Sequence, residues 1–226
     1  MQHTVVITGA NRGIGLALAE HYSNRGDNVY ALCRSSSAAL EILKGVVVIE
    51  GIDFTCSDYI KVIRERLIKK LENESIDLLI NNAGILSKDT LGSVNYAEFS
   101  KQLAVNAVAP LRLSEALVQK LKRESKVVMI TSRMGSIADN SSGGEYGYRM
   151  SKAALNAAGK SLSIDLREKN ICVAIIHPGF VKTDLVENLG ELSPYESAKN
   201  ILARIGEMKI ENSGEFIHAN GSVLPW

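Results

Sequence analysis

The sequence predicts an α/β fold in which one doubly wound parallel sheet carries helices on both faces. Short runs rich in β-branched residues alternate with segments of helical periodicity, which is the order of elements in such folds. The runs are apolar almost throughout, as expected for parallel strands that helices cover on both faces. A glycine cluster also separates the first run from the first helical segment. Together these features predict a Rossmann fold.

Seven runs are expected to form the strands. They span Thr4–Thr8, Asn28–Cys33, Val46–Glu50, Asp77–Ile80, Lys126–Thr131, Cys172–His177 and, near the end of the chain, Gly214–His218. Helical spacing of apolar residues predicts one helix from Ile14 and others over Ile60–Leu71, about Tyr96–Arg123, about Glu145–Glu168 and Pro194–Glu207. No linker interrupts the alternation, so residues 1–226 are expected to form a single domain that carries all of its ligand sites.

Composition and charge argue against several classes of function. The 26 basic and 25 acidic residues leave a formal charge of +1, which favours neither nucleic acid nor an acidic membrane surface as a partner. No apolar run approaches the roughly 20 residues of a spanning helix, and Met1-Gln2-His3 does not resemble a signal peptide. The three cysteines form no C-x-x-C pair, so no metal site is expected. A cytoplasmic protein is predicted.

The glycine cluster predicts a site for a dinucleotide. The chain reads Thr8-Gly9-Ala10-Asn11-Arg12-Gly13-Ile14-Gly15 between the first strand and the first helix. A turn without Cβ atoms lets backbone N–H groups and a helix N-terminus approach a pyrophosphate. Gly9, Asn11, Arg12, Gly13, Ile14 and Gly15 are therefore candidate cofactor-binding residues. The spacing G-x-x-x-G-x-G differs from G-x-G-x-x-G, and a tight structural turn is the alternative interpretation.

The residue after the second strand favours NADP(H) over NAD(H). A carboxylate at that position binds the ribose 2′-hydroxyl of NAD and repels a 2′-phosphate, whereas this chain has Arg34, followed by Ser35, Ser36 and Ser37. Arg12 in the glycine turn is a second cation that is expected near the same phosphate, and guanidinium groups suit phosphate oxygens. The alternative is that both arginines are solvated surface residues.

Tyr148, Lys152 and Ser132 form the candidate catalytic set. Tyr148 and Lys152 are four residues apart in a predicted helix, so they lie on one face. A nearby ammonium favours the phenolate, so Lys152 is expected to lower the pKa of Tyr148 from about 10 towards neutrality. Ser132 follows the fifth of the predicted strands, where a hydroxyl can stabilise negative charge on a carbonyl oxygen. A chance Tyr–Lys pair is the alternative.

These motifs occur in the order in which they occur in the short-chain dehydrogenase/reductase family, which the chain resembles over essentially its whole length. The matching segments are Thr8–Gly15, Asn81–Gly84, Asn106, Ser132, Tyr148–Lys152, and Pro178-Gly179 with Thr183. The stretch Tyr148–Leu166 and the ending Gly214–Trp226 are most similar to the branch that contains C-factor and sniffer-type carbonyl reductases. Ser132 and Tyr148 stand 16 residues apart, a few more than is usual in the family.

The resemblance implies roles for further residues. Asp53 would contact the adenine, Asn82, Ala83 and Gly84 would line the cofactor pocket, and Asn106 would hold a water that links Lys152 to solvent. Lys152 would also bind the nicotinamide ribose, and Thr183 the carboxamide or a phosphate. Pro178, Gly179 and Val181 complete the cofactor candidates. Purely structural alternatives are that Asn82 braces a turn, Asn106 caps a bend and Thr183 caps a helix.

The predicted function is reduction of a ketone or aldehyde by NADPH, or the reverse oxidation of a secondary alcohol. One alternative is an NADP-binding signalling or redox-sensing protein of C-factor type, and another is a sugar-nucleotide epimerase or dehydratase. The full set Ser132, Tyr148, Lys152 and Asn106 argues against pure sensing. Small residues in the helix after Tyr148, together with the family resemblance, predict a homodimer or homotetramer. Met134, Ile137, Phe180 and Leu185 hint at an apolar carbonyl substrate.

Overall fold

A computed structural model of the protein describes residues 2–226 and has the predicted α/β architecture. Seven strands form one sheet in the order β3-β2-β1-β4-β5-β6-β7, and all neighbouring strands are parallel. The strands are β1 Thr4–Thr8, β2 Asn28–Leu32, β3 Val46–Ile49, β4 Ile76–Asn81, β5 Leu121–Ile130, β6 Cys172–His177 and β7 Phe216–His218. The strand order reverses between β1 and β4, where such sheets leave a crevice at their carboxyl ends.

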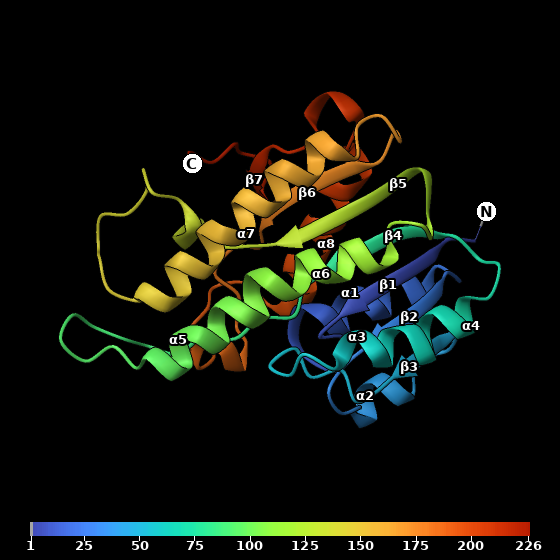
Figure 1. Ribbon diagram of the computed structural model, residues 1–226, viewed down its shortest axis with the longest axis horizontal. Helices are drawn as coiled ribbons and strands as arrows, with labels where there is room; N and C mark the ends of the chain where they lie inside the picture. The colour runs from blue at the N-terminus through green and yellow to red at the C-terminus, as the bar shows by residue number, and fades with distance from the viewer. Residues whose placement is uncertain (1) are drawn as a thin grey trace.

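Helices cover both faces of the sheet (Figure 1). On one face α5, α6 and α7 cross in front of the strands, and α3 and α4 lie beside them, while α1 and α8 pack together behind. The α-helices are α1 Gly13–Asn24, α2 Ala38–Glu41, α3 Tyr59–Val62, α4 Lys69–Leu71, α5 Tyr96–Leu103, α6 Ala109–Leu117, α7 Tyr146–Asp165 and α8 Pro194–Glu207. Two π-helical segments, η1 Ile63–Ile68 and η2 Ala104–Val108, join α3 to α4 and α5 to α6.

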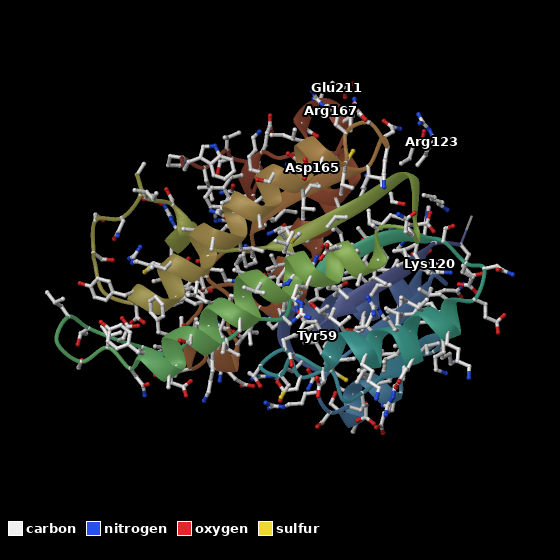
Figure 2. The ribbon with its side chains drawn as sticks, viewed as in Figure 1. Tyr59, Lys120, Arg123, Asp165, Arg167 and Glu211 are labelled. Atoms are coloured by element: carbon white, nitrogen blue, oxygen red, sulfur yellow. The ribbon has the colours of Figure 1, made fainter. Side chains whose placement is uncertain are left out.

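Side chains that alternate along the central strands pack into two separate cores, one on each face of the sheet. In β1, Val5 and Ile7 pack with residues of α1 and α8, whereas Val6 points into the core beneath α3 to α7. Tyr59, labelled in Figure 2, belongs to this second core, and its ring lies 5.2 Å from the Arg112 guanidinium carbon. Both faces of the sheet are therefore covered and shielded from solvent, which explains why polar and apolar residues do not alternate along the strands.

The predicted helix over Tyr96–Arg123 is wrong at its end. Helix α6 stops at Leu117 and β5 begins at Leu121, five residues before the predicted strand. The first half of β5 carries exposed charges, among them Arg123 (Figure 2), which resemble a polar helix end in the sequence. Pairing of Leu121 with Ile76, followed by a register shift, keeps this half in the sheet. Backbone pairing with β4 therefore overrides the local pattern.

Short elements complete the molecule. Three 3-10 turns span Arg133–Gly135 (η3), Asp184–Val186 (η4) and Ile210–Asn212 (η5). The short helix α2 was not predicted; its N-cap Ser37 donates its hydroxyl to the backbone oxygen of Asn11, 2.7 Å away. Within residues 2–226, no helix is both long enough and apolar enough to cross a membrane. The same residues contain no group of three side chains arranged to hold a metal ion.

Candidate active site

A cavity of about 510 Å³ lies at the carboxyl ends of the central strands. Its lining includes most of the predicted cofactor-binding residues: Gly9, Asn11, Arg12, Gly13, Ile14, Arg34, Asp53, Asn82, Ala83, Gly84, Tyr148, Lys152, Pro178 and Thr183. Gly15, Gly179 and Val181 lie outside this lining. A larger hollow of about 600 Å³ beside the edge strand β3 is lined mainly by charged residues of both signs and lacks the Tyr–Lys pair.

The glycine turn is built so closely that side chains do not fit. A Cβ on Gly9 would lie 3.0 Å from the Cα of Ala83, and Gly9 has a φ of +66°. A Cβ on Gly15 would lie only 2.2 Å from the backbone oxygen of Gly9. Gly13 and Ile14 at the start of α1 line the cavity, and α1 carries no acidic residue in its first turn. This cradle fits the phosphates of a dinucleotide.

Asn82 braces the glycine turn. Its Nδ2 donates to the backbone oxygens of Thr8 and Gly9 at 3.0 and 3.4 Å. The Thr8 hydroxyl in turn accepts the N–H groups of Asn82 and Ala83 at 2.9 and 3.0 Å. These bonds join the ends of β1 and β4, the two strands between which the strand order reverses. The Asn82 side chain thus has a structural role, and its backbone lies in the cavity wall.

The two candidate cations differ in their surroundings. The Arg12 guanidinium forms an ion pair with Asp184, 2.5 Å away, although both side chains are largely exposed. Arg34 lines the cavity close enough to Asp53 to help lower the pKa of that carboxyl, which hydrogen bonds to the Thr55 hydroxyl and N–H lower more strongly. The predicted contact of Asp53 with an adenine remains a prediction. Arg34 is the cation better placed to receive an additional phosphate.

Tyr148 and Lys152 lie together in the cavity wall on α7. The Lys152 Nζ is 5.7 Å from the centre of the Tyr148 ring, and the two side chains are almost fully buried. Ser132 lies two residues after the end of β5 and is the N-cap of η3. Its hydroxyl accepts the N–H of Met134 at 3.2 Å, and it lies near enough to the Tyr148 phenol to lower the pKa of that group. The structure therefore brings the three predicted catalytic residues to one place.

The expected lowering of the Tyr148 pKa is wrong for this structure. Burial raises the pKa of Tyr148 to about 12, and the hydrogen bond from Ser132 opposes this effect only in part. Burial likewise lowers the pKa of Lys152 to about 8. Lys152 donates to the backbone oxygen of Ile130 at 3.0 Å. Loss of solvation is therefore the main cause of both shifts.

Asn106 lies behind the cavity, in the π-helical segment η2. It is fully buried, and its Oδ1 accepts the N–H of Ile85 at 2.8 Å. Its Nδ2 donates to the oxygen of Ile85 and to the Ser151 hydroxyl at 2.8 and 2.9 Å. The side chain thus holds protein groups. The water that the family resemblance implies remains a prediction.

Sequence reasoning missed several residues of the cavity wall. Most of them end or follow strands or belong to the loop after β6, with Val105 in η2 and Pro194 at the start of α8: Leu32, Cys33, Ile52, Phe54, Thr55, Ile85, Val105, Ile130, Thr131, Lys182, Asp184, Asn188 and Pro194. Their positions just beyond strand ends are the signal that would have found many of them. Ser35 and Leu185, both named from the sequence, also line the cavity. Tyr146, the second tyrosine at the start of α7, is 36% exposed and is not part of this cavity wall.

The surroundings of His177, the last residue of β6, predict that the fold is less stable in acid. Burial, helped by nearby cations, lowers its pKa from 6.5 to about 3, and its Nδ1 has no partner among the described residues. Between these values the unfolded chain binds more protons, so the free energy of unfolding should fall as pH decreases below 6.5. We expect this group to account for a loss of about 2 kcal/mol by pH 5. Urea denaturation of wild type and His177→Asn measures it.

The expected result is a smaller difference between pH 7 and pH 5 in His177→Asn than in wild type. The matched control is His3→Asn, because His3 is 47% exposed and faces Asp77 at 3.4 Å, so its replacement should not reduce the difference. Equal pH dependence in wild type and His177→Asn would contradict the assignment.

The fold, the glycine cradle and the buried Tyr–Lys pair define an oxidoreductase of the Rossmann type. Residues 3–193 match the family model described as short chain dehydrogenase. The chain therefore belongs to the short-chain dehydrogenase/reductase family, as its ordered motifs predict.

Curated relatives agree with this assignment. The chain is 35% identical to a 1-hydroxy-2-glutathionyl-2-methyl-3-butene dehydrogenase of Rhodococcus sp. (strain AD45) over 99% of each chain. It is 41% identical to the C-signal protein of Myxococcus xanthus over 67% of this chain and 93% of that protein.

Solved structures place the chain beside carbonyl reductases. The NADPH-bound carbonyl reductase from chicken fatty liver has a TM-score of 0.91 and 30% identity, with all of both chains covered. The carbonyl reductase Sniffer of D. melanogaster has a TM-score of 0.90 and 30% identity, again over both whole chains. The predicted similarity to the C-factor and sniffer branch is confirmed.

Proposed function

We propose that the protein is an NADPH-dependent carbonyl reductase in which Tyr148 is the acid and base. The observation that carries the proposal is the burial of Tyr148 and Lys152 in the wall of the cavity, with the Ser132 hydroxyl near enough to the phenol to lower its pKa. Similarity to carbonyl reductases supports the reaction class. The Rhodococcus relative is named as a dehydrogenase of an alcohol, so oxidation of a secondary alcohol is the reverse direction to test.

The chain's own side chains suit the reductive direction. NADPH, when bound, supplies the hydride for the carbonyl carbon. Tyr148, with its pKa raised to about 12, stays protonated at neutral pH and is ready to donate its proton to the carbonyl oxygen. The Ser132 hydroxyl stabilises the negative charge that develops on the same oxygen. Lys152, held by Ile130, carries positive charge behind the phenol and favours proton loss.

We propose NADP(H) as the cofactor, with Arg34 binding the 2′-phosphate. The similar chicken enzyme was solved with NADPH, and Arg34 lines the cavity of this protein. The glycine cradle would hold the pyrophosphate, and Thr183 and Lys152 would contact the nicotinamide half. Because Arg12 pairs with Asp184, it must exchange this exposed partner before it binds phosphate. Breaking an exposed ion pair of this kind costs about 1 kcal/mol or less.

Arg34→Ala is expected to weaken NADPH binding by about 10- to 100-fold, because a hydrogen bond to a charged group contributes about 1.5–3 kcal/mol. NADH lacks the 2′-phosphate, so its dissociation constant should change little. Nicotinamide fluorescence titrations measure both values. Arg64→Ala, an exposed arginine outside the cavity, is the matched control. Equal weakening of NADPH and NADH in Arg34→Ala would contradict the assignment of Arg34 to the phosphate.

A panel of aldehydes, quinones and diketones, followed by NADPH absorbance, tests the reductase itself. We expect turnover with apolar carbonyl compounds, because apolar Leu185 lines the cavity and apolar Ile137 and Phe180 are exposed in the loops after β5 and β6. Tight NADPH binding without turnover of any compound would favour the second candidate, a signalling role. The 41% identity to the C-signal protein is the observation that keeps this candidate.

We infer in addition that the chain forms a homodimer or homotetramer in the cytoplasm. Met150, Ala154, Ala157 and Ile164 lie on the exposed side of α7, and Val108 and Leu111 are exposed on the neighbouring η2–α6 segment. An apolar helix face of this kind is typical of subunit contacts. Light scattering of the purified protein measures the subunit number.

A further inference from the structure

The loop after β4 is held by a ladder of buried side-chain amides. Asn106 bonds both the N–H and the oxygen of Ile85 at 2.8 Å each. Gln102 bonds both groups of Ser87 in the same way, at 3.1 and 3.3 Å. The two amide residues are four apart along α5 and η2 and are both 0% exposed. The two amides therefore hold alternate residues of the extended segment that follows Gly84, a residue of the cavity wall.

The next alternate residue, Asp89, is the last member of this ladder and binds the start of α7, the helix that carries Tyr148. Its Oδ1 accepts the N–H of Tyr146 at 2.7 Å, and its Oδ2 accepts the N–H of Gly147 at 3.1 Å. Its backbone oxygen accepts the N–H of Glu145 at 3.0 Å. Asp89 is 7% exposed. A residue 57 positions earlier in the chain thus caps the first turn of α7.

Helix α7 has no cap of its own at this end. Glu145 occupies the N-cap position but makes no side-chain cap bond, and its φ is +51°. The space around Gly147 is also closed, because a Cβ there would lie 2.6 Å from Nε2 of Gln102 and 3.3 Å from Oδ2 of Asp89. Helices α5 and α7 pack side by side (Figure 1), so the ladder lies at their contact. The start of α7 is consequently placed by Asp89 and Gln102.

We propose that Asp89 is a positioning residue that sets the Tyr148 phenol against Ser132. The inference rests on the proposed function, in which Tyr148 transfers the proton. Asp89 holds the two residues that immediately precede Tyr148, and the Ser151 hydroxyl, bonded by Asn106, donates to the backbone oxygen of Tyr148 at 2.7 Å. The backbone of Tyr148 is therefore held from both sides. Asp89 itself does not line the cavity.

Asp89→Ala tests this role in the full chain. Removal of both acceptor oxygens frees the first turn of α7, and a small displacement of a catalytic group costs about 10- to 100-fold in kcat. The dissociation constant of NADPH and the KM of the carbonyl should stay within about twofold, because the groups that bind them are untouched. Asp89→Asn keeps one acceptor oxygen and is expected to lose less. It also decides the test if Asp89→Ala fails to fold.

Asn95→Ala is the matched control. Asn95 caps α5 through two N–H groups at 3.1 and 3.2 Å, so its loss should lower Tm like the loss of Asp89 but leave kcat unchanged. Wild-type kcat in Asp89→Ala would overturn the proposal. An equal fall of kcat in Asn95→Ala would do so too, as would loss of NADPH binding in both Asp89 variants, because each outcome assigns Asp89 to general stability.

Tyr148→Phe, measured in the same series, separates this inference from the proposed function. Turnover retained in Tyr148→Phe removes the proposed function and the positioning role together. An inactive Tyr148→Phe beside a fully active Asp89→Ala removes the positioning role alone.

Discussion

Tyr148→Phe is expected to lower kcat by about 10²- to 10⁴-fold, because positioned general acids contribute factors of this size. The change removes one oxygen from a side chain that is 6% exposed, so the fold and the cofactor cavity should persist. NADPH titration by fluorescence checks the cavity, and steady-state rates with a carbonyl from the panel measure the loss. The dissociation constant of NADPH should change much less than kcat.

Tyr146→Phe is the matched control for this experiment. Tyr146 lies two residues earlier on the same helix, outside the cavity wall, and is 36% exposed. The same chemical change should therefore leave kcat near its wild-type value. If Tyr146→Phe is the inactive variant and Tyr148→Phe retains turnover, the assignment of the proton donor is wrong.

The pH dependence follows from the same surroundings. Burial raises the pKa of Tyr148 to about 12 and lowers that of Lys152 to about 8. In the free enzyme, the phenol therefore stays protonated well above neutral pH, whereas the ammonium is lost near pH 8. The pH dependence of the reductase rate between pH 7 and pH 9 should therefore follow the titration of Lys152 rather than that of Tyr148.

Much of the fold was predictable because the relevant information is local. Unbroken apolar runs such as Val5–Ile7 mark strands that are covered on both faces, and glycines between a strand and a helix mark the turn. Prediction failed at Leu121–Ser125, where three consecutive charged residues belong to a strand. Contacts with β4, which the local pattern does not reveal, hold that segment in the sheet: Leu121 pairs with Ile76, and the Ser125 hydroxyl donates to the Ile76 oxygen at 2.7 Å.

The candidate site divides in a similar way. Tyr148 and Lys152 were predictable because their spacing along one helix carries the signal, and Ser132 because it follows a strand. Asp89 and Gln102 were missed because their importance depends on where the loop after β4 meets α7, a contact between distant parts of the chain. The raised pKa of Tyr148 was missed for the same reason, since burial is a property of the folded chain.

Gly15→Ala is expected to abolish tight NADPH binding, whereas the same change at Gly206 should not. At Gly15 the new Cβ would lie 2.2 Å from the oxygen of Gly9 and 2.6 Å from Nδ2 of Asn82. Backbone must move, so the turn opens and the brace formed by Asn82 is lost. If two hydrogen bonds to phosphate are lost with it, affinity falls about 100-fold or more. Overpacking also destabilises the fold by about 1–3 kcal/mol.

Gly206 is the matched control, because it is an exposed residue of α8 with nothing within 4 Å of a new Cβ. Alanine favours a helix over glycine by about 0.5–1 kcal/mol, so Gly206→Ala should keep or slightly raise Tm and leave NADPH binding intact. Opposite effects of one chemical change in two helices would tie the loss to the cradle, because helix propensity favours alanine at both positions. Wild-type NADPH affinity in Gly15→Ala would mean that the turn tolerates a side chain and that its close backbone approach is not what binds the pyrophosphate.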